Sequence, residues 1–331
     1  MKTRRLGSVV SLIVFIIFSC LAGWIFLNRQ HVIDQITVWQ YEPSSEVEKI
    51  ASRADLSDTG LFYFYTSRPE VESTQKFNSE CERKEEHSAI LGCYANMRIY
   101  IFDIKNEQLD GIEEVTASHE MLHAAWDRLS ESERSTLAPL LEAAYQKVAD
   151  GELKERMDYY ARAQPGERAN ELHSIIGTEL SDVGSELEAH YKKYFTKRST
   201  IVGFHTAYKA VFNTLESKSS TLLSELKNLE QSINTRVKEY TAKKQALEQE
   251  NADIQANYTQ LDRSNLATVS AYNARVNSLN ARASELRVEY DTLSSLTTEY
   301  NAKVAEYNQT VVSQQNLQKS LDSNLAPAPM L

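Results

Sequence analysis

Five consecutive residues, His119-Glu120-Met121-Leu122-His123, have the types and spacing of a catalytic metal site. On a helix, side chains at positions i and i+4 lie on one face about one turn apart. His119 and His123 can therefore present two imidazoles to one metal ion, and zinc prefers nitrogen ligands of this kind. Glu120 then lies beside the ion, where a carboxylate can take a proton from metal-bound water and pass it to a leaving amine.

The residues around this motif predict the helix that it needs. The stretch from Gly111 to Arg128 is expected to be helical, with Met121, Leu122 and Trp126 forming a face that can be buried. A chance occurrence of H-E-x-x-H is the alternative explanation. The predicted helix and the β-prone segment before it favour a metal site.

At the motif, the chain resembles the zincin superfamily of metallopeptidases, over about residues 60–200. The resemblance implies zinc-dependent hydrolysis of peptide bonds, with Glu120 as the general base. It also implies an edge strand above the motif helix that aligns the substrate backbone, and Met97 to Asp103 is expected to be that strand. The longer metzincin pattern does not fit, because Trp126 stands where it has Gly and Leu129 where it has His.

The third metal ligand must then come from another segment. In the gluzincin branch, a Glu on a later helix completes the site, and Glu171 resembles that ligand, with Asn170 and Ser174 as similar flanks. Glu179, about two turns later on a similar face, is the alternative, and His173 is a third candidate. Whichever Glu does not bind the metal can orient a zinc-bound His.

The subfamily stays open, because the thermolysin-like pattern would have Asp where Ile175 stands.

A transition-state oxyanion usually needs a donor besides the metal, and His190, Tyr191 and Tyr194 are candidates. The packed face of an amphipathic helix is the favoured role for these three residues.

The N-terminus predicts a membrane anchor. Lys2, Arg4 and Arg5 precede an uncharged stretch from Leu6 to Leu27, which is long enough to span about 30 Å of hydrocarbon as a helix. The basic residues favour a cytoplasmic N-terminus, so residues after about 30 are expected outside the cytoplasm. A cleaved signal peptide, or a lipoprotein modified at Cys20, is the alternative.

Cysteines and charge agree with this placement. Cys81 and Cys93 are expected to form a disulfide in an oxidising compartment, with two buried thiols as the alternative. The net charge of -10 argues against binding to nucleic acid and against charge-driven attachment to anionic lipid. The expected partners are therefore a peptide or protein substrate, and the membrane through the N-terminal helix.

The remaining elements follow from local patterns. Gly60 to Thr66 is aromatic and predicts a strand. Ser130 and Glu133 predict a capping box at the start of a helix, and Glu167 to Leu180 predicts another helix. From His205 onward, apolar residues alternate at spacings of four and three, which is typical of a coiled coil that pairs with itself or a partner.

The heptad phase slips near Asp262 to Val269, which fits either a stutter in one rod or, as the two similar arms favour, an antiparallel hairpin. The predicted fold is α+β and mostly helical. Residues 1–30 form the tail and transmembrane anchor, 31–204 a zincin-like domain with a small sheet, 205–325 the coiled coil and 326–331 a disordered tail.

The sequence thus predicts a membrane-anchored zinc peptidase that acts outside the cytoplasm. The alternative is a non-catalytic envelope scaffold that works through its coiled coil. Glu120 favours the enzyme, because a support that only binds metal does not need a carboxylate at that position.

Overall fold

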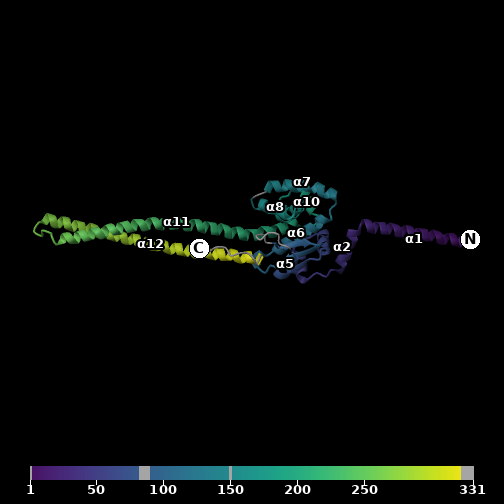
Figure 1. The fold of residues 1–331 in the computed structure, drawn as a ribbon, viewed down its shortest axis with the longest axis horizontal. Helices are drawn as coiled ribbons and strands as arrows, with labels where there is room; N and C mark the ends of the chain where they lie inside the picture. The colour runs from purple at the N-terminus through teal and green to yellow at the C-terminus, as the bar shows by residue number, and fades with distance from the viewer. Residues whose placement is uncertain (1, 82–89, 149–150, 322–331) are drawn as a thin grey trace. The chain divides into compact units, whose positions relative to one another are not determined.

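The computed structural model describes residues 2–81, 90–148 and 151–321, with the backbone alone for residues 2–11. The chain is mostly helical with one small sheet, which confirms the mostly helical α+β class (Figure 1). The first elements are α1 Lys2–Leu27, α2 Arg29–Gln40, α3 Ser45–Arg53, α4 Asp58–Thr66, β1 Glu70–Glu72, α5 Thr74–Glu80, β2 Gly92–Ala95 and β3 Arg98–Phe102. A 3-10 turn at Glu107–Leu109 leads to α6 Ile112–Asp127, α7 Glu131–Val148, α8 Gly151–Ala163, α9 Arg168–Glu179, α10 Gly184–Tyr191, α11 Arg198–Tyr258 and α12 Leu266–Leu321.

The chain divides into two compact units. One holds the chain up to Val211 together with the end of α12 from Leu317, and the other holds Phe212–Asn316. Helix α11 begins in the first unit and continues into the second, so the predicted boundary after residue 204 falls inside one unbroken helix. The predicted disordered tail, 326–331, lies outside the described residues.

The sheet has the strand order β1-β3-β2. Strand β1 is parallel to β3. Strand β2 leads through a tight turn, in which Asn96 and Met97 have positive φ angles of 52° and 60°, into β3, which runs antiparallel to it. The expectation that Met97 to Asp103 forms the edge strand is therefore wrong. That segment is the central strand, because β2 folds back against it and takes the outer position.

Strand β3 separates two apolar clusters. Ile99 and Ile101 are fully buried in the main core against the motif helix, where Met121 is also fully buried. Tyr100 points to the opposite face, into a smaller cluster around Phe77 and Cys81. This alternation is the period of two that a strand with both faces covered shows.

The strand predicted at Gly60 to Thr66 is wrong, because these residues form helix α4. Ser57 caps the helix, since its side chain accepts a hydrogen bond from the Gly60 N–H. Phe64 is fully buried in the core, and a Cβ at Gly60 would lie 2.1 Å from the Tyr194 carbonyl oxygen. Tertiary packing thus overrides the β-propensity of the aromatic residues.

The predicted motif helix and the two helices predicted after it are confirmed as α6, α7 and α9. The capping box at the start of α7 is also present. The Ser130 side-chain oxygen accepts from the Glu133 N–H at 3.3 Å, and a Glu133 carboxylate oxygen accepts from the Ser130 N–H at 2.9 Å. The disulfide between Cys81 and Cys93 is formed, with 5.8 Å between the two Cα atoms.

The N-terminal helices bear on the predicted anchor. Within the described part of the chain, no single helix meets a test of length and hydropathy for crossing a bilayer. Residues Leu12–Leu27 and Arg29–Gln40 meet it together, as a pair bent by 82°. The predicted transmembrane anchor therefore stays a prediction.

In the second unit, α11 and α12 run antiparallel, joined by a turn at the predicted phase slip (Figure 1). Asp262 accepts from the Ser264 N–H at 2.9 Å within that turn. Far from the turn, Arg236 pairs with Glu289 at 2.9 Å. The favoured hairpin arrangement thus agrees with the structure, whereas coiled-coil packing as such remains a prediction.

Candidate metal centre

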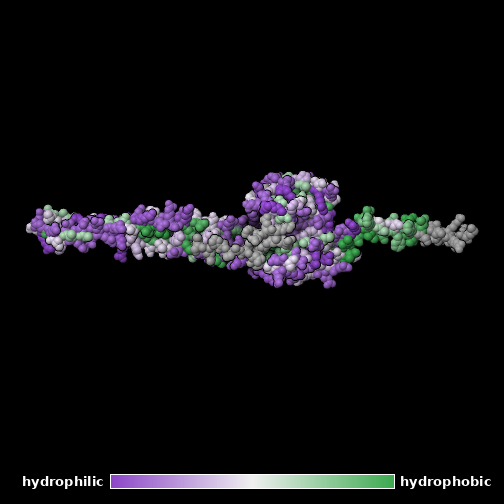
Figure 2. All heavy atoms as spheres, in the orientation of Figure 1, coloured by the Kyte–Doolittle hydropathy of each residue, from purple (hydrophilic) through white to green (hydrophobic). Residues whose placement is uncertain are grey.

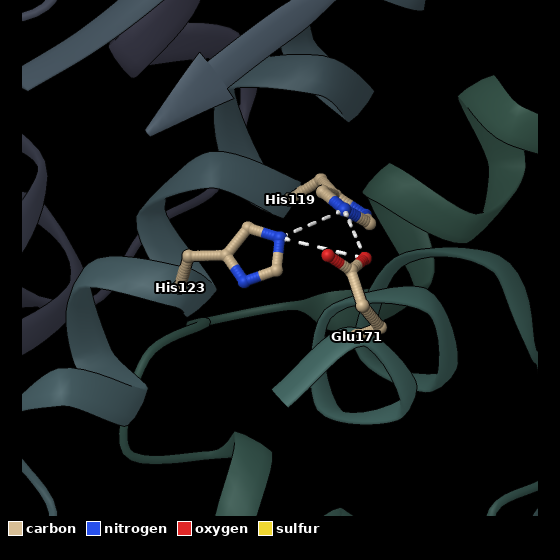
Figure 3. A group of neighbouring side chains, drawn as sticks. All are labelled: His119, His123 and Glu171. Atoms are coloured by element: carbon tan, nitrogen blue, oxygen red, sulfur yellow. Dashed lines mark hydrogen bonds and ion pairs between the residues drawn. The ribbon is translucent and has the colours of Figure 1, made fainter. Parts of the chain in front are cut away.

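Helix α6 carries His119 and His123, helix α9 carries Glu171, and the two helices bring these three side chains together (Figure 3). The Nε2 atoms of His119 and His123 lie 3.2 Å apart. One Glu171 carboxylate oxygen lies 3.9 Å from the first of these nitrogens and 3.8 Å from the second. Glu171, the first choice from the sequence, is therefore the acid that completes the cluster.

The cluster fits a zinc ion. Tetrahedral zinc with nitrogen and oxygen ligands at about 2.0–2.1 Å holds its ligand atoms about 3.3 Å apart. The two imidazole nitrogens have this spacing, and the Glu171 oxygen is slightly farther away. That oxygen, Oε2, is buried and has no hydrogen-bond partner among the described residues. A buried acceptor without a partner costs free energy, and a bound cation would satisfy it.

Asn170 orients one of the imidazoles. Its side-chain oxygen lies 2.9 Å from Nδ1 of His123. An amide oxygen can only accept, so Nδ1 carries the proton and Nε2 keeps its lone pair toward the cluster. The Asn170 amide nitrogen in turn donates to Glu167 at 3.0 Å. A zinc-bound His commonly has such a partner, and losing it weakens metal affinity.

The pKa values follow from burial and from the neighbouring charges. Burial holds the pKa of His119 well below its usual value, and the nearby His123 adds to this effect. For His123, burial acts to lower the pKa, but the Glu171 and Glu120 carboxylates outweigh it and the pKa is raised. Burial also raises the pKa of Glu171, which His123 partly offsets. Metal binding requires neutral imidazoles and an ionised carboxylate, so it would release protons here.

Glu120 lies beside the cluster and faces strand β2. Its side chain is only 6% exposed, and burial raises the pKa of its carboxyl to about 7. Glu171 also raises this pKa, while His123 and a backbone hydrogen bond from Tyr94 lower it. A buried carboxyl that titrates near neutrality can both take and return a proton.

Strand β2 approaches the motif helix very closely at Gly92. A Cβ there would lie 2.5 Å from a methyl carbon of Thr116 and 3.1 Å from a carboxylate oxygen of Glu120. The Leu91 carbonyl accepts from the Phe102 N–H at 2.8 Å, so Leu91 pairs toward β3. Because neighbouring residues of a strand point their peptide groups to opposite sides, those of Gly92 point away from the sheet.

Glycine at this position should therefore be required for the packing. We expect Gly92→Ala to lower the free energy of unfolding by about 1–3 kcal/mol, the usual cost of overpacking. Chemical denaturation of the full chain measures it. Gly151→Ala is the matched control, since a Cβ there meets nothing within 4 Å and should be neutral or slightly stabilising. Equal unfolding free energies for the two variants would contradict this role of Gly92.

The cluster opens into a cavity of about 520 Å³. Strand β2 and helices α6, α8 and α9 contribute its walls. The side chains and backbone that line it include Gly92, Tyr94, His119, Glu120, His123, Arg156, Tyr159, Tyr160, Glu171 and Glu179. A substrate in this cavity would therefore contact the cluster, Glu120 and the outer edge of β2 together.

The alternative ligands have other partners. Glu179 lines the cavity, but its carboxylate accepts from Arg156 at 2.9 and 2.6 Å and lies 3.3 Å from His205. Burial acts to raise the pKa of Glu179, but His205 and Arg156 outweigh it and lower this pKa to about 2. His173 is fully buried, with its Nε2 only 2.8 Å from that of His190. Neither residue belongs to the three-residue cluster.

The predicted oxyanion donors do not line the cavity. His190 contacts His173, and the Tyr191 hydroxyl donates to the His173 carbonyl oxygen at 2.8 Å. Tyr191 and Tyr194 are buried in the core. His190 and Tyr191 lie on a packed face of α10, as predicted, whereas Tyr194 lies in the turn after the helix ends.

Tyr160 of α8 lines the cavity, whereas the three predicted donors do not. Burial raises the pKa of the Tyr160 hydroxyl, as do the carboxylates of Glu171 and Glu120. Tyr160 therefore lines the same cavity as Glu120 and Glu171. Tyr160 lies in the run Asp158-Tyr159-Tyr160, which has no motif that could have singled it out.

Comparisons with protein-family profiles, with curated proteins and with solved structures find no match for this chain. The resemblance to zincins therefore rests on the motif and stays a prediction.

Proposed function

We propose that this chain is a zinc-dependent peptidase of the gluzincin type. Zinc is bound by His119, His123 and Glu171, and Glu120 is the general base. The observation that carries the proposal is the meeting of all three ligand atoms within 4.8 Å of one another. Glu120 and β2, the outer strand of the sheet in the described part of the chain, border the same cavity, which supports peptide hydrolysis over metal storage.

Each of these groups has a distinct task. When bound, zinc polarises the scissile carbonyl and lowers the pKa of water. The Glu120 carboxylate accepts the proton of the attacking water and donates it to the departing amine. The outward peptide groups of Gly92 can pair with an extended substrate, as in the addition of a strand to a sheet edge. In this proposal β2 aligns the substrate backbone, the role that the resemblance to zincins implied for residues Met97–Asp103.

The Tyr160 hydroxyl is the proposed donor to the transition-state oxyanion. Tyr160→Phe is expected to lower kcat about 10²–10³-fold with little change in KM, as for loss of one such donor. The neighbouring Tyr159→Phe is the control, because Tyr159 lines the cavity as well. Steady-state kinetics on one peptide separates kcat from KM, and equal kcat values for the two variants would assign the donor elsewhere.

Metal removal tests the proposal as a whole. The purified full chain is expected to contain one zinc per molecule and to cleave an unstructured protein such as casein. Treatment with 1,10-phenanthroline should remove both zinc and activity, and one equivalent of zinc should restore both. Cleavage that persists after complete zinc removal, or a zinc-loaded protein without cleavage, would contradict the proposal.

We further propose that α1 anchors the chain in a membrane, with the following domain on the extracytoplasmic side. The uncharged stretch and the basic residues before it support an anchor. The Cys81–Cys93 disulfide supports an oxidising compartment. Protease protection of the full chain in membrane vesicles would test this topology.

The scaffold remains the second candidate function. It is favoured by the hairpin of α11 and α12, in which a coiled coil would display a long surface to a partner or a second copy. A phenotype that depends on residues 212–316 but not on Glu120 would favour this function.

A further inference from the structure

Helix α2 follows α1 after a single residue, Asn28. The two helices are bent by 82° relative to each other. The bend remains hydrogen-bonded, since the Asn28 N–H donates to the Trp24 carbonyl oxygen at 2.9 Å. If α1 crosses a bilayer along its normal, α2 must therefore run nearly parallel to the bilayer surface.

One face of α2 exposes large apolar side chains. Ile33, Ile36 and Trp39 recur at a spacing of three and are 52%, 44% and 76% exposed. Residues at this spacing share one side of a helix. Figure 2 shows hydrophobic residues on α1 and again next to it, where the chain enters the globular part. Trp is typical of the lipid–water interface, where its ring is buried and its N–H stays hydrated.

The opposite face of α2 is fixed to the globular part by charge. Asp34 is only 3% exposed and accepts two hydrogen bonds from Arg128, both at 2.8 Å. Arg128 directly follows the motif helix and also donates to the Ala124 carbonyl oxygen at 2.7 Å. The bidentate pair thus joins α2 to the C-terminal end of the helix that carries His119 and His123.

We propose that α2 is an interfacial helix that lies on the phospholipid bilayer with Ile33, Ile36 and Trp39 inserted between headgroups. The net charge of -10 argues against charge-driven binding to anionic lipid, so apolar insertion is the favoured mode of contact. The Asp34–Arg128 pair then holds the motif helix at a fixed height and tilt above the membrane. This inference rests on the proposed anchoring by α1 and not on peptidase activity.

A second copy of the chain is the other possible occupant of this face. Lipid is favoured because the apolar face continues directly from α1, after a bend that aligns it with the bilayer plane. The face is also one narrow stripe on a 12-residue helix, well short of the area that a stable protein interface needs.

Spin labelling of the full chain in phospholipid nanodiscs tests the proposal. In a Cys20→Ser background, a nitroxide is placed at Ile36→Cys or Trp39→Cys. Ile16→Cys within α1 and Ser132→Cys on α7 serve as the lipid and water references. Collision rates with oxygen, which partitions into lipid, and with a water-soluble nickel chelate are then compared. The oxygen-to-nickel ratio at both α2 positions is expected to lie between those of the references.

The other outcomes would each overturn the proposal. A ratio at both α2 positions equal to that at Ser132 would place the face in water. Low collision rates with both reagents would show that protein, such as a second copy, covers the face. High nickel access at Ile16 would overturn the anchor together with this inference. None of these results depends on zinc or on hydrolysis, so the peptidase proposal is tested separately.

Discussion

Glu120→Gln is expected to abolish measurable peptide hydrolysis while one zinc ion per chain remains bound. The amide has the shape of the carboxylate but cannot accept the proton of the attacking water. General-base catalysis of this kind contributes about 10²–10⁴-fold to the rate. Glu120 is not one of the three clustered ligands, so the metal should stay. Zinc content and kcat are measured on the same preparation.

Glu113→Gln provides a matched control. Glu113 lies on the same helix and accepts a hydrogen bond from the Ile104 N–H at 2.8 Å, which an amide oxygen can also accept. This variant should keep wild-type activity. A Glu120→Gln variant that stays active would show that Glu120 is not the general base. A variant that loses both activity and zinc would show that the main role of Glu120 is structural.

The Glu171→Ala and Glu179→Ala variants are expected to have opposite effects. Loss of an outer partner of a zinc ligand costs about 10–100-fold in affinity, so loss of Glu171 as a ligand should cost more than about 100-fold. The fold should survive, because the removed Glu171 oxygen has no hydrogen-bond partner among the described residues. Removing Glu179 instead leaves Arg156 without its carboxylate, which destabilises the fold but spares the three ligands.

Zinc titration and thermal unfolding of both variants separate these effects. Glu171→Ala should show weak zinc binding and a midpoint close to that of the zinc-free parent. Glu179→Ala should bind zinc with a lower midpoint. Full zinc retention by Glu171→Ala would exclude it as the third ligand, and zinc loss in Glu179→Ala alone would assign that role to Glu179.

Local patterns in the sequence predicted the parts of the fold that depend on neighbouring residues. The motif helix, the capping box at Ser130 and the helix that carries Glu171 each follow from chemistry within one or two turns. The choice of Glu171 over Glu179 came from the resemblance, and the geometry agrees because only Glu171 reaches the two imidazoles.

The errors arose where distant contacts decide the structure. The aromatic segment from Gly60 is helical because it packs on the Tyr194 backbone, which no local pattern contains. Strand β2 was not predicted at all, although it displaces β3 from the edge. Tyr160 and Gly92 belong to the site through contacts with α6 and α9 partners, so their roles required the fold.

The Cys81–Cys93 disulfide bears on when the cavity wall is completed after synthesis of the chain. Cys93 belongs to β2, and its bond to Cys81 fastens this strand to the end of α5, on the far side from Glu120. Thiols stay reduced in the cytoplasm and oxidise outside it. With the extracytoplasmic topology proposed above, the Cys81–Cys93 bond would form only after export, and this border of the cavity would lack its covalent tie while the chain is still in the cytoplasm.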